Sequence, residues 1–480
     1  MGTISTIDIV IILGYLLFIV GIGLWYSRKK RNTSSGYFLA GNSLTWPVIG
    51  ASLFASNIST VHLVGLTESG YKDGIVWGNF EWFSVFELII LAFIFIPFYL
   101  RTKITTLPEF LEKRYDGKSR VLLAIFSILA ALFMHIGVSF YAGAIVFEKL
   151  FGLNILASIL IIAVATGIYT VIGGLVSVVV TETVQTIILL IGAISITILA
   201  IYQLPQVGIH SYEALKEAVD PDRFKAVDFD SAKKGFTFMD ILLGHLVLGI
   251  WYWCTDQTIV QRALGAKSEK QAKLGAIFAG FLKILPVFIM VIPGILAFAL
   301  FKESIGENTK SVLPIMIMEL MPIGLKGLMI AALLAAVMSS VAAALNSCST
   351  LIVYDVFNKL NPGLSDMAKI QIGKITSVVV LLLAVAWSPF LGDLGGIFEL
   401  INQMFSIFAP SIVAVFLWGV LSRKGTANAS FYTLIGGSLF ALVIFIIEKY
   451  IPIGGVSNYI SHPEGLGINW LRQTYLYFIV

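Results

Sequence analysis

The chain has 480 residues, of which 58% are hydrophobic and only 12% are charged, and its formal net charge is +4. A soluble globular protein is roughly 45–50% apolar and about 25% charged, so this composition excludes an ordinary soluble domain. Because apolar runs recur from one end of the chain to the other, we expect a single integral membrane domain over residues 1–480.

Apolar runs of roughly 20 residues mark segments long enough to cross a bilayer. The first run has full spanning length and lacks the basic flank and cleavage site of a signal peptide, so we expect it to be retained. A last apolar run, residues 475–480, is interpreted as the start of one more helix cut short. The predicted spans are 7–27, 45–68, 76–100, 120–148, 154–173, 176–202, 238–262, 272–301, 324–356, 372–391, 394–421 and 426–449.

The orientation follows from the Lys and Arg residues of the short loops, which are enriched on the cytoplasmic side. When the spans are counted through, the basic loops all fall on one side, so we predict that the N-terminus is outside. The long mixed-sign segment 203–237 then lies outside as a solvated loop with short helices. The basic loops are those at 28–31, 101–103, 113–120, 262–273, 359–374 and 423–424.

The second span is interrupted by polar residues at mid-depth. Polar groups are tolerated there only where they face protein or a water-filled cavity. We interpret the stretch as a discontinuous helix whose unwound carbonyls and nearby hydroxyls bind an ion and a solute. The interrupting residues are Ser56, Asn57, Ser59, Thr60 and His62.

The seventh span is interrupted in the same way, at Thr255-Asp256-Gln257. The two interrupted spans are separated by an odd number of spans, so one half of the chain is inverted relative to the other. This is the arrangement of inverted-repeat transporters, whose site lies at the midplane between two broken helices.

Two charged residues lie inside predicted spans. A carboxylate in hydrocarbon is costly, so Glu81 either accepts hydrogen bonds from a polar solute or sits at the outer interface beside Trp77 and Trp82. Lys283 needs a counter-charge, from Glu81 or Asp256. It either joins two helices in a salt bridge or donates to a solute hydroxyl, and the two roles are compatible.

Residues 251–257 combine aromatic and polar side chains in the sequence WYWCTDQ. Aromatic faces stack on the C–H face of sugar rings, and amides and carboxylates bind hydroxyls. Trp and Tyr also form belts at the membrane interface. Both a binding platform and an interfacial belt fit this stretch.

Ser339 and Ser340 lie among alanines in the ninth span. Small residues of this kind permit close helix packing. The alternative is cation binding, since hard cations prefer oxygen ligands. The two hydroxyls with the carbonyls of Ala55 and Ile58 then form a neutral oxygen cage for sodium. Spacing leaves both alternatives open.

The remaining motifs exclude several function classes. His62 and His135 are single intramembrane histidines, of a kind that is more often structural than metal-binding. Cys254 and Cys348 are expected to be small packing residues. There is no Cys/His metal spacing, glycine-rich phosphate loop, basic nucleic-acid surface or nucleophile elbow. We therefore expect neither an enzyme nor a nucleic-acid-binding protein.

Four stretches make the chain similar to the sodium/glucose cotransporters of the solute:sodium symporter family, over nearly all of its length. They are residues 51–58, 169–175, 251–262 and 338–347. The resemblance implies an all-α integral membrane protein with the leucine-transporter-like fold of two inverted five-helix repeats. The repeats would be 45–202 and 238–421, with an extra N-terminal helix at 7–27 and C-terminal helices in 426–480.

The resemblance also implies particular binding residues. Phe80 and Ser84 flank Glu81. We expect Phe80 to act as a gate residue and Ser84 to contact the solute. The sodium site would use the carbonyls of Ala55, Ile58 and Ala336 and the hydroxyls of Ser339 and Ser340. The sugar contacts would be Asn57, His62, Glu81, Trp253 and Lys283, with Tyr252 as an inner aromatic gate and Asp256 as a neighbour.

Three departures from the family pattern affect this expectation. Asn402, next to Gln403, stands where the family has a sugar-binding glutamine, and the shorter amide alters which sugar is held. Glu182 replaces an aspartate and is a candidate for the cation route. Ala342 and Ala343 stand where members with a second sodium site have hydroxyls, so we predict one sodium per solute.

The sequence therefore predicts a multi-pass plasma-membrane symporter. It would use a sodium ion to import a hexose-like sugar of the glucose, galactose or mannose class across the lipid bilayer by alternating access. Inositol, sialic acid, an amino acid or a carboxylate are the rival solutes, although Glu81 argues against a carboxylate and Lys283 weakens that argument. A sugar sensor or channel on the same fold, without accumulation, is the alternative from a different class.

Overall fold

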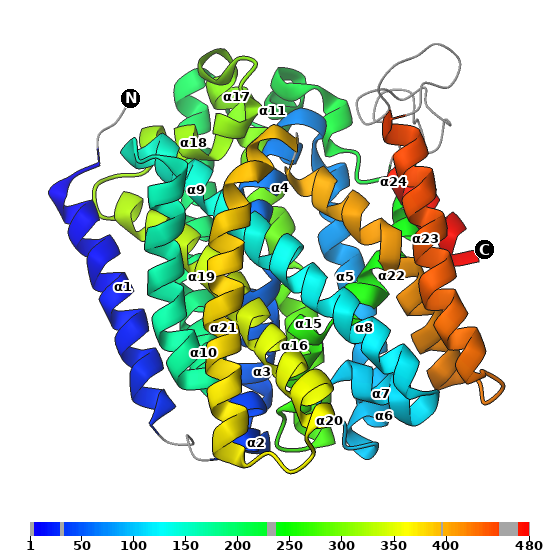
Figure 1. Ribbon diagram of the computed structural model, residues 1–480. Helices are drawn as coiled ribbons and strands as arrows, with labels where there is room; N and C mark the ends of the chain where they lie inside the picture. The colour runs from blue at the N-terminus through cyan, green and yellow to red at the C-terminus, as the bar shows by residue number, and fades with distance from the viewer. Residues whose placement is uncertain (1–3, 29–32, 228–236, 395–396, 451–468, 480) are drawn as a thin grey trace.

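The computed structural model describes residues 4–28, 33–227, 237–394, 397–450 and 469–479. Within these ranges the regular structure is helical, apart from one isolated bridge between Leu44 and Ala266. The long helices run side by side, with α1 on one flank and α23 and α24 on the other (Figure 1). Short helices α11 and α18 gather at one end, and α2, α7 and α20 at the opposite end.

Ten helical segments of the described chain are long and apolar enough to cross a membrane, and the bent pair α3 and α4 adds one more. The long segments are Thr6–Ser27 (α1), Ile75–Arg101 (with α5, Asn79–Ile90, and α6, Ile96–Arg101), Gly117–Phe151 (with α8, Gly117–Leu129, and α9, Val138–Phe151), Ile155–Val207 (with α10, Ile155–Gln203), Phe238–Thr255 (with α13, Phe238–Asp240, and α14, Leu246–Gly249), Glu269–Ile305 (with α16, Glu269–Leu282, and α17, Ile292–Ile305), Leu325–Leu360 (with α19, Leu325–Leu351, and α20, Asn358–Leu360), Asp366–Leu391 (with α21, Asp366–Trp387), Asn402–Leu421 (in α22, Ile397–Leu421) and Ala427–Ile447 (in α23, Ala427–Tyr450).

Shorter helices connect these segments. In their described residues all twelve predicted spans fall on helical segments; residues 395–396 of the span 394–421 lie outside the described chain. Helix α24 begins five residues before the predicted run 475–480, whose last residue is also not described. The predicted loop 203–237 contains α11, and its residues 228–236 are not part of the described chain. The short helices are Ser34–Phe38 (α2), Leu107–Arg114 (α7), Tyr212–Val219 (α11), Gln257–Leu264 (α15), Val312–Leu320 (α18) and Trp470–Ile479 (α24).

The second span is broken where the sequence predicts. Helix α3 (Trp46–Asn57) ends and α4 (Thr60–Asp73) begins at an angle of 62°. Ile58 and Ser59 between them are extended, with ψ of 97° and 173°. The seventh span is interrupted at Asp256, with φ of −86° and ψ of 123°, and its carboxylate caps α15 by accepting from the Thr258 amide at 2.9 Å. Both predicted interruptions are confirmed.

Helix α10 covers the fifth and sixth predicted spans, and its axis breaks at Gly174. This residue has φ of +60° and ψ of −156°, a backbone conformation that is essentially restricted to glycine. A Cβ there would lie 2.4 Å from the Tyr37 carbonyl oxygen. The boundary between the predicted spans 154–173 and 176–202 therefore coincides with a single-residue kink.

Helix α19 (Leu325–Leu351) forms the centre of the core. Every residue from Met329 to Leu351 is buried, and the helix packs against α10, α1 and α3. Its small residues allow this close approach on all sides. The buried Asp8 of α1 accepts from the backbone amides of Gly324 and Gly327 at 2.8 Å each, so α1 holds the N-terminal end of α19.

Candidate functional site

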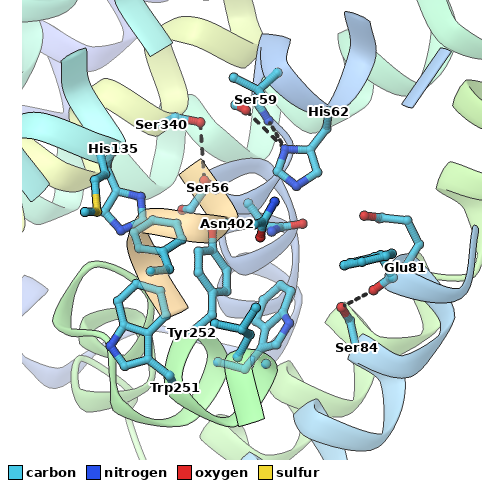
Figure 2. A pocket seen from close by; sticks show the side chains of 18 of the residues that line it. Ser56, Ser59, His62, Glu81, Ser84, His135, Trp251, Tyr252, Ser340 and Asn402 are labelled. Atoms are coloured by element: carbon cyan, nitrogen blue, oxygen red, sulfur yellow. Dashed lines mark hydrogen bonds between the residues drawn. The ribbon is translucent and has the colours of Figure 1, made fainter. Parts of the chain in front are cut away.

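A cavity of about 120 Å³ lies beside the break between α3 and α4. Its walls come from both broken spans, from α5, α19 and α22, from residues 134–139 and from the C-terminal end of α16. Figure 2 shows Glu81 and Ser84 on one side and His135 and Trp251 on the other, with Tyr252 between them. The predicted solute and gate residues that line it are Asn57, His62, Phe80, Glu81, Ser84, Tyr252, Trp253, Lys283 and Asn402.

The two charges in the wall pair with each other. The Lys283 Nζ donates to a carboxylate oxygen of Glu81 and to the Asn57 amide oxygen at 2.6 Å. It also lies 5.7 Å from the centre of the Trp253 ring. Glu81 and Lys283 are 3% and 1% exposed, so the interfacial placement of Glu81 that the sequence left open is wrong. Glu81 and Asp256 were the two candidates for the counter-charge of Lys283, and the residue that pairs with it is Glu81.

An ammonium group has three donors. Two N–H donors of the Lys283 ammonium bind Glu81 and Asn57, and the lysine lines the cavity. One donor therefore remains for a ligand hydroxyl, and the paired carboxylate keeps lone pairs that can accept from another.

The other polar residues of the wall are held by contacts within their own helices. The imidazole of His62 lies 3.1 Å from the Ser59 hydroxyl, across the first turn of α4. The hydroxyl of Ser84 donates to the Phe80 carbonyl at 3.0 Å. The Phe80 ring stacks on Trp77 with centroids 5.4 Å apart, so this proposed gate residue has a rigid support.

Aromatic rings make up the opposite wall. Tyr252 is half-buried and lies edge-on to Trp253, with centroids 5.2 Å apart. Trp251 packs on Phe405 of α22 at 4.4 Å. Trp251, Trp253 and Phe405 are buried in the core and Tyr252 packs against it, so the interfacial-belt interpretation of residues 251–253 is wrong. Asn402 also lines the cavity from α22.

Besides members of the predicted sodium site, Asp256 and Glu182 lie away from the cavity lining. Asp256 is buried, and its carboxylate lies 2.8 Å from His135 Nε2. His135 itself lines the cavity, so Asp256 reaches it through the histidine. Glu182 is fully buried on α10, where it accepts from Arg262 at 2.7 Å and from the hydroxyls of Ser52 and Ser56.

The predicted cation-binding residues come together behind the cavity. Ser339 Oγ lies 2.8 Å from the Ala55 carbonyl oxygen and 3.1 Å from that of Ala336. Ser340 Oγ lies 3.3 Å from the Ser56 carbonyl oxygen and 3.1 Å from that of Ala336. The proximity of α19 to the broken helix that the sequence predicted is confirmed.

The helix break explains why these carbonyls are available. In an intact helix the Ala55 carbonyl would accept from the amide of residue 59. Here the Ser59 amide faces His62 Nδ1 at 3.4 Å instead. The fully buried Ile58 is extended and contributes backbone oxygen in the same stretch. Hard cations prefer oxygen ligands, and carbonyl and hydroxyl oxygens are of this type, so the donor set fits sodium.

Sequence reasoning missed two ionisable residues beside the cavity. Glu87 is fully buried on α5, and His245 lines the cavity, with its Nε2 3.6 Å from Glu87 Oε1. A second carboxylate within the third span was the available signal for Glu87. Nothing local pointed to His245, because its neighbour comes from another helix.

The model of the sodium:solute symporter family matches residues 37–437 of the chain. The chain belongs to the sodium:solute symporter family. Family members are transporters and not enzymes, so this chain is a membrane transporter, and the resemblance seen in the sequence is confirmed. The predicted cation-binding residues and the cavity both lie within the matched region.

Curated relatives of this symporter match over almost its whole length. The chain is 34% identical to sodium/glucose cotransporter 2 of Rattus norvegicus, over 98% of the chain and 76% of the relative. It is 32% identical to sodium/glucose cotransporter 1 of Oryctolagus cuniculus, over 98% of the chain and 77% of the relative. It is 35% identical to sodium/myo-inositol cotransporter 2 of Homo sapiens, over 92% of the chain and 70% of the relative.

The fold is shared with a solved Na⁺-coupled sialic acid symporter in a substrate-bound outward-open state. The TM-score is 0.82 with 22% identity, covering 99% of this chain and 96% of the other. The predicted all-α, leucine-transporter-like membrane fold is confirmed. At this identity the similarity concerns the fold and not the solute.

Proposed function

We propose that the protein imports a hexose-like sugar by coupling it to the inward movement of one sodium ion. The main support for this proposal is that Ser56 and Ser340 are shared between the solute cavity and the place where sodium would bind. Both residues line the cavity, and both belong to the carbonyl and hydroxyl cluster at the helix break. A cation bound there would fix one wall of the solute cavity.

The wall chemistry supports a neutral, hydroxyl-rich solute. The Glu81–Lys283 ion pair and Asn57 offer donors and acceptors with no net charge. Tyr252 and Trp253 offer aromatic faces for the C–H side of a ring. A glucose, galactose or mannose class sugar fits this combination. A cyclic polyol such as myo-inositol is the second candidate, because an inositol cotransporter is among the relatives.

We infer an alternating-access mechanism. Sodium at Ala55, Ile58, Ala336, Ser339 and Ser340 would hold α3 and α4 against α19 with the cavity open to the outside. The solute would then close the outer gate at Phe80, and Tyr252 would close the inner side. Linkage requires sodium to raise solute affinity by the same factor as the solute raises sodium affinity.

The membrane potential supplies much of the driving force. One positive charge moving down about 100 mV releases about 2.3 kcal/mol, which supports roughly fifty-fold accumulation of a neutral solute before any sodium gradient is counted. Ala342 and Ala343 carry no side-chain oxygen at the position proposed for a second ion, in support of one sodium per solute. A ratio of two from reversal potentials would contradict this.

The proposed orientation follows from the basic loops. With the N-terminus outside, the loop before α8 and that between α15 and α16 face the cytoplasm. We expect the plasma membrane as the location. Cysteines introduced at Ser5 and Lys267 would label from outside and inside, respectively, and the reverse pattern would contradict the orientation.

The test is uptake into proteoliposomes with an inward sodium gradient and, as a control, an equal potassium gradient. Radiolabelled D-glucose, D-galactose, D-mannose, myo-inositol, sialic acid and an amino acid are compared. We expect sodium-driven accumulation of a sugar or inositol, abolished in Glu81→Gln and Lys283→Ala. Equilibration without accumulation would indicate a channel or sensor and overturn the symport proposal.

A further inference from the structure

Glu87 is a buried carboxylic acid that the sodium and solute sites do not use. It lies on α5, six residues after Glu81, and is 0% exposed. In the described part of the chain, neither of its carboxylate oxygens has a hydrogen-bond partner. An isolated carboxylate in such a place costs several kcal/mol, whereas a protonated carboxyl avoids that cost.

Its nearest ionisable neighbour is His245. The two are 3.6 Å apart, from Glu87 Oε1 to His245 Nε2, whereas a charge-assisted hydrogen bond spans about 2.7–2.9 Å. The geometry is therefore not that of a formed ion pair. Nε2 also lacks any other hydrogen-bond partner among the described residues.

The tautomer of His245 decides which residue can donate. The imidazole makes a hydrogen bond with the Phe80 backbone, and a backbone carbonyl can only accept, so Nδ1 carries the hydrogen. The lone pair of Nε2 then faces Glu87. Two acceptors facing each other repel, and a proton on the Glu87 carboxyl turns the contact into a donor–acceptor pair.

The surroundings supply no free cation for Glu87. The titratable or charged groups that interact with it are Glu81 and Lys283, which bind each other, together with His245 and Cys254. The Cys254 thiol contacts the Glu87 backbone carbonyl at 3.6 Å. Within the described chain, the ammonium that could compensate a second carboxylate is already paired.

Gly249 brings this group to the wall of the cavity. A Cβ at Gly249 would lie within 1.8 to 1.9 Å of the Glu87 carboxyl atoms, and Gly249 lines the cavity. The absence of a side chain therefore makes room for the carboxyl directly behind the wall.

We propose that Glu87 and His245 form a proton-binding site beside the solute cavity, in which a neutral Glu87 carboxyl turns its O–H toward His245 Nε2 and the 3.6 Å separation shortens to a hydrogen bond. The bound proton keeps this wall uncharged while a neutral solute occupies the cavity. Removing it at alkaline pH would place an unpaired negative charge behind Gly249.

Infrared difference spectroscopy of the purified protein in lipid tests the site without any transported solute, so its outcome is independent of the symport proposal. At neutral pH we expect a protonated-carboxyl C=O band that is lost in Glu87→Gln and retained in Glu148→Gln, an exposed control on α9. An unchanged band in Glu87→Gln would overturn the proposal.

A second variant covers the case in which Glu87→Gln fails to fold. In His245→Phe the carboxyl loses its acceptor, and we expect the band to move to higher frequency. No movement would contradict the pairing. Loss of the wild-type band on adding NaCl or KCl at constant pH would identify a metal-cation site and reject the proton site.

Discussion

Replacing Lys283 by Met separates its structural role from its role in recognition. The substitution keeps an unbranched side chain but leaves Glu81 buried and unpaired. Removing one partner of a buried ion pair costs about 3–5 kcal/mol of stability. The variant also loses the donor proposed for the solute, a hydrogen bond to a charged group worth about 1.5–3 kcal/mol. Solute binding should weaken about ten- to 150-fold.

The double variant Glu81→Gln/Lys283→Met distinguishes the two roles. A neutral pair of similar volume should recover most of the stability, while solute affinity should stay low. Thermal unfolding in detergent and radioligand binding measure the two quantities. Lys326→Met is the matched control: this buried lysine bonds the Met318 carbonyl at 3.2 Å outside the cavity, so solute affinity should be unchanged. Normal affinity in Lys283→Met would refute the reasoning.

Three further substitutions test the scaffold. Asp8→Ala leaves two amides at the start of α19 without their acceptor and should cost about 1–3 kcal/mol; unchanged thermal unfolding would contradict the cap. Gly174→Ala should cost about 1–3 kcal/mol because of its positive φ, and a wild-type melting curve would show that the kink is not required. Burial raises the pKa of Glu112, but hydrogen bonds and ion pairs with Lys359 and Arg120 lower it further, so its net pKa is below 4.5. These contacts therefore stabilise the fold above that pH, and their contribution is lost as pH falls through the lowered pKa. The acid-induced loss of stability should be shallower in Glu112→Gln by less than about 1 kcal/mol, and equal slopes would exclude the contribution.

The helix breaks could be predicted from the sequence because their signal is local. Small polar residues inside an apolar run cannot face lipid, so Ser56 to Thr60 had to lie against protein. The same reasoning located the interruption at Asp256. Adjacent hydroxyls at Ser339 and Ser340, on a helix of small residues, pointed to a neighbouring backbone in the same way.

The pairing of charges could not be predicted, because it depends on how distant helices rotate against each other. Lys283 could have paired with Glu81 or Asp256, and the choice of Glu81 reflects the packing of α16 against α5. Asp256 instead faces His135, from a third helix. The contact of Glu87 with His245 has the same origin, so no periodicity along either segment reveals it.

Sodium dependence of solute binding in Ser339→Ala tests the central claim most directly. Ser347→Ala is the control, since Ser347 is buried on the same helix and its hydroxyl has no hydrogen-bond partner among the described residues. The account predicts that sodium raises solute affinity in the wild type and in Ser347→Ala, and that this increase is largely lost in Ser339→Ala. An undiminished sodium effect in Ser339→Ala would contradict a cation held between the broken helix and α19.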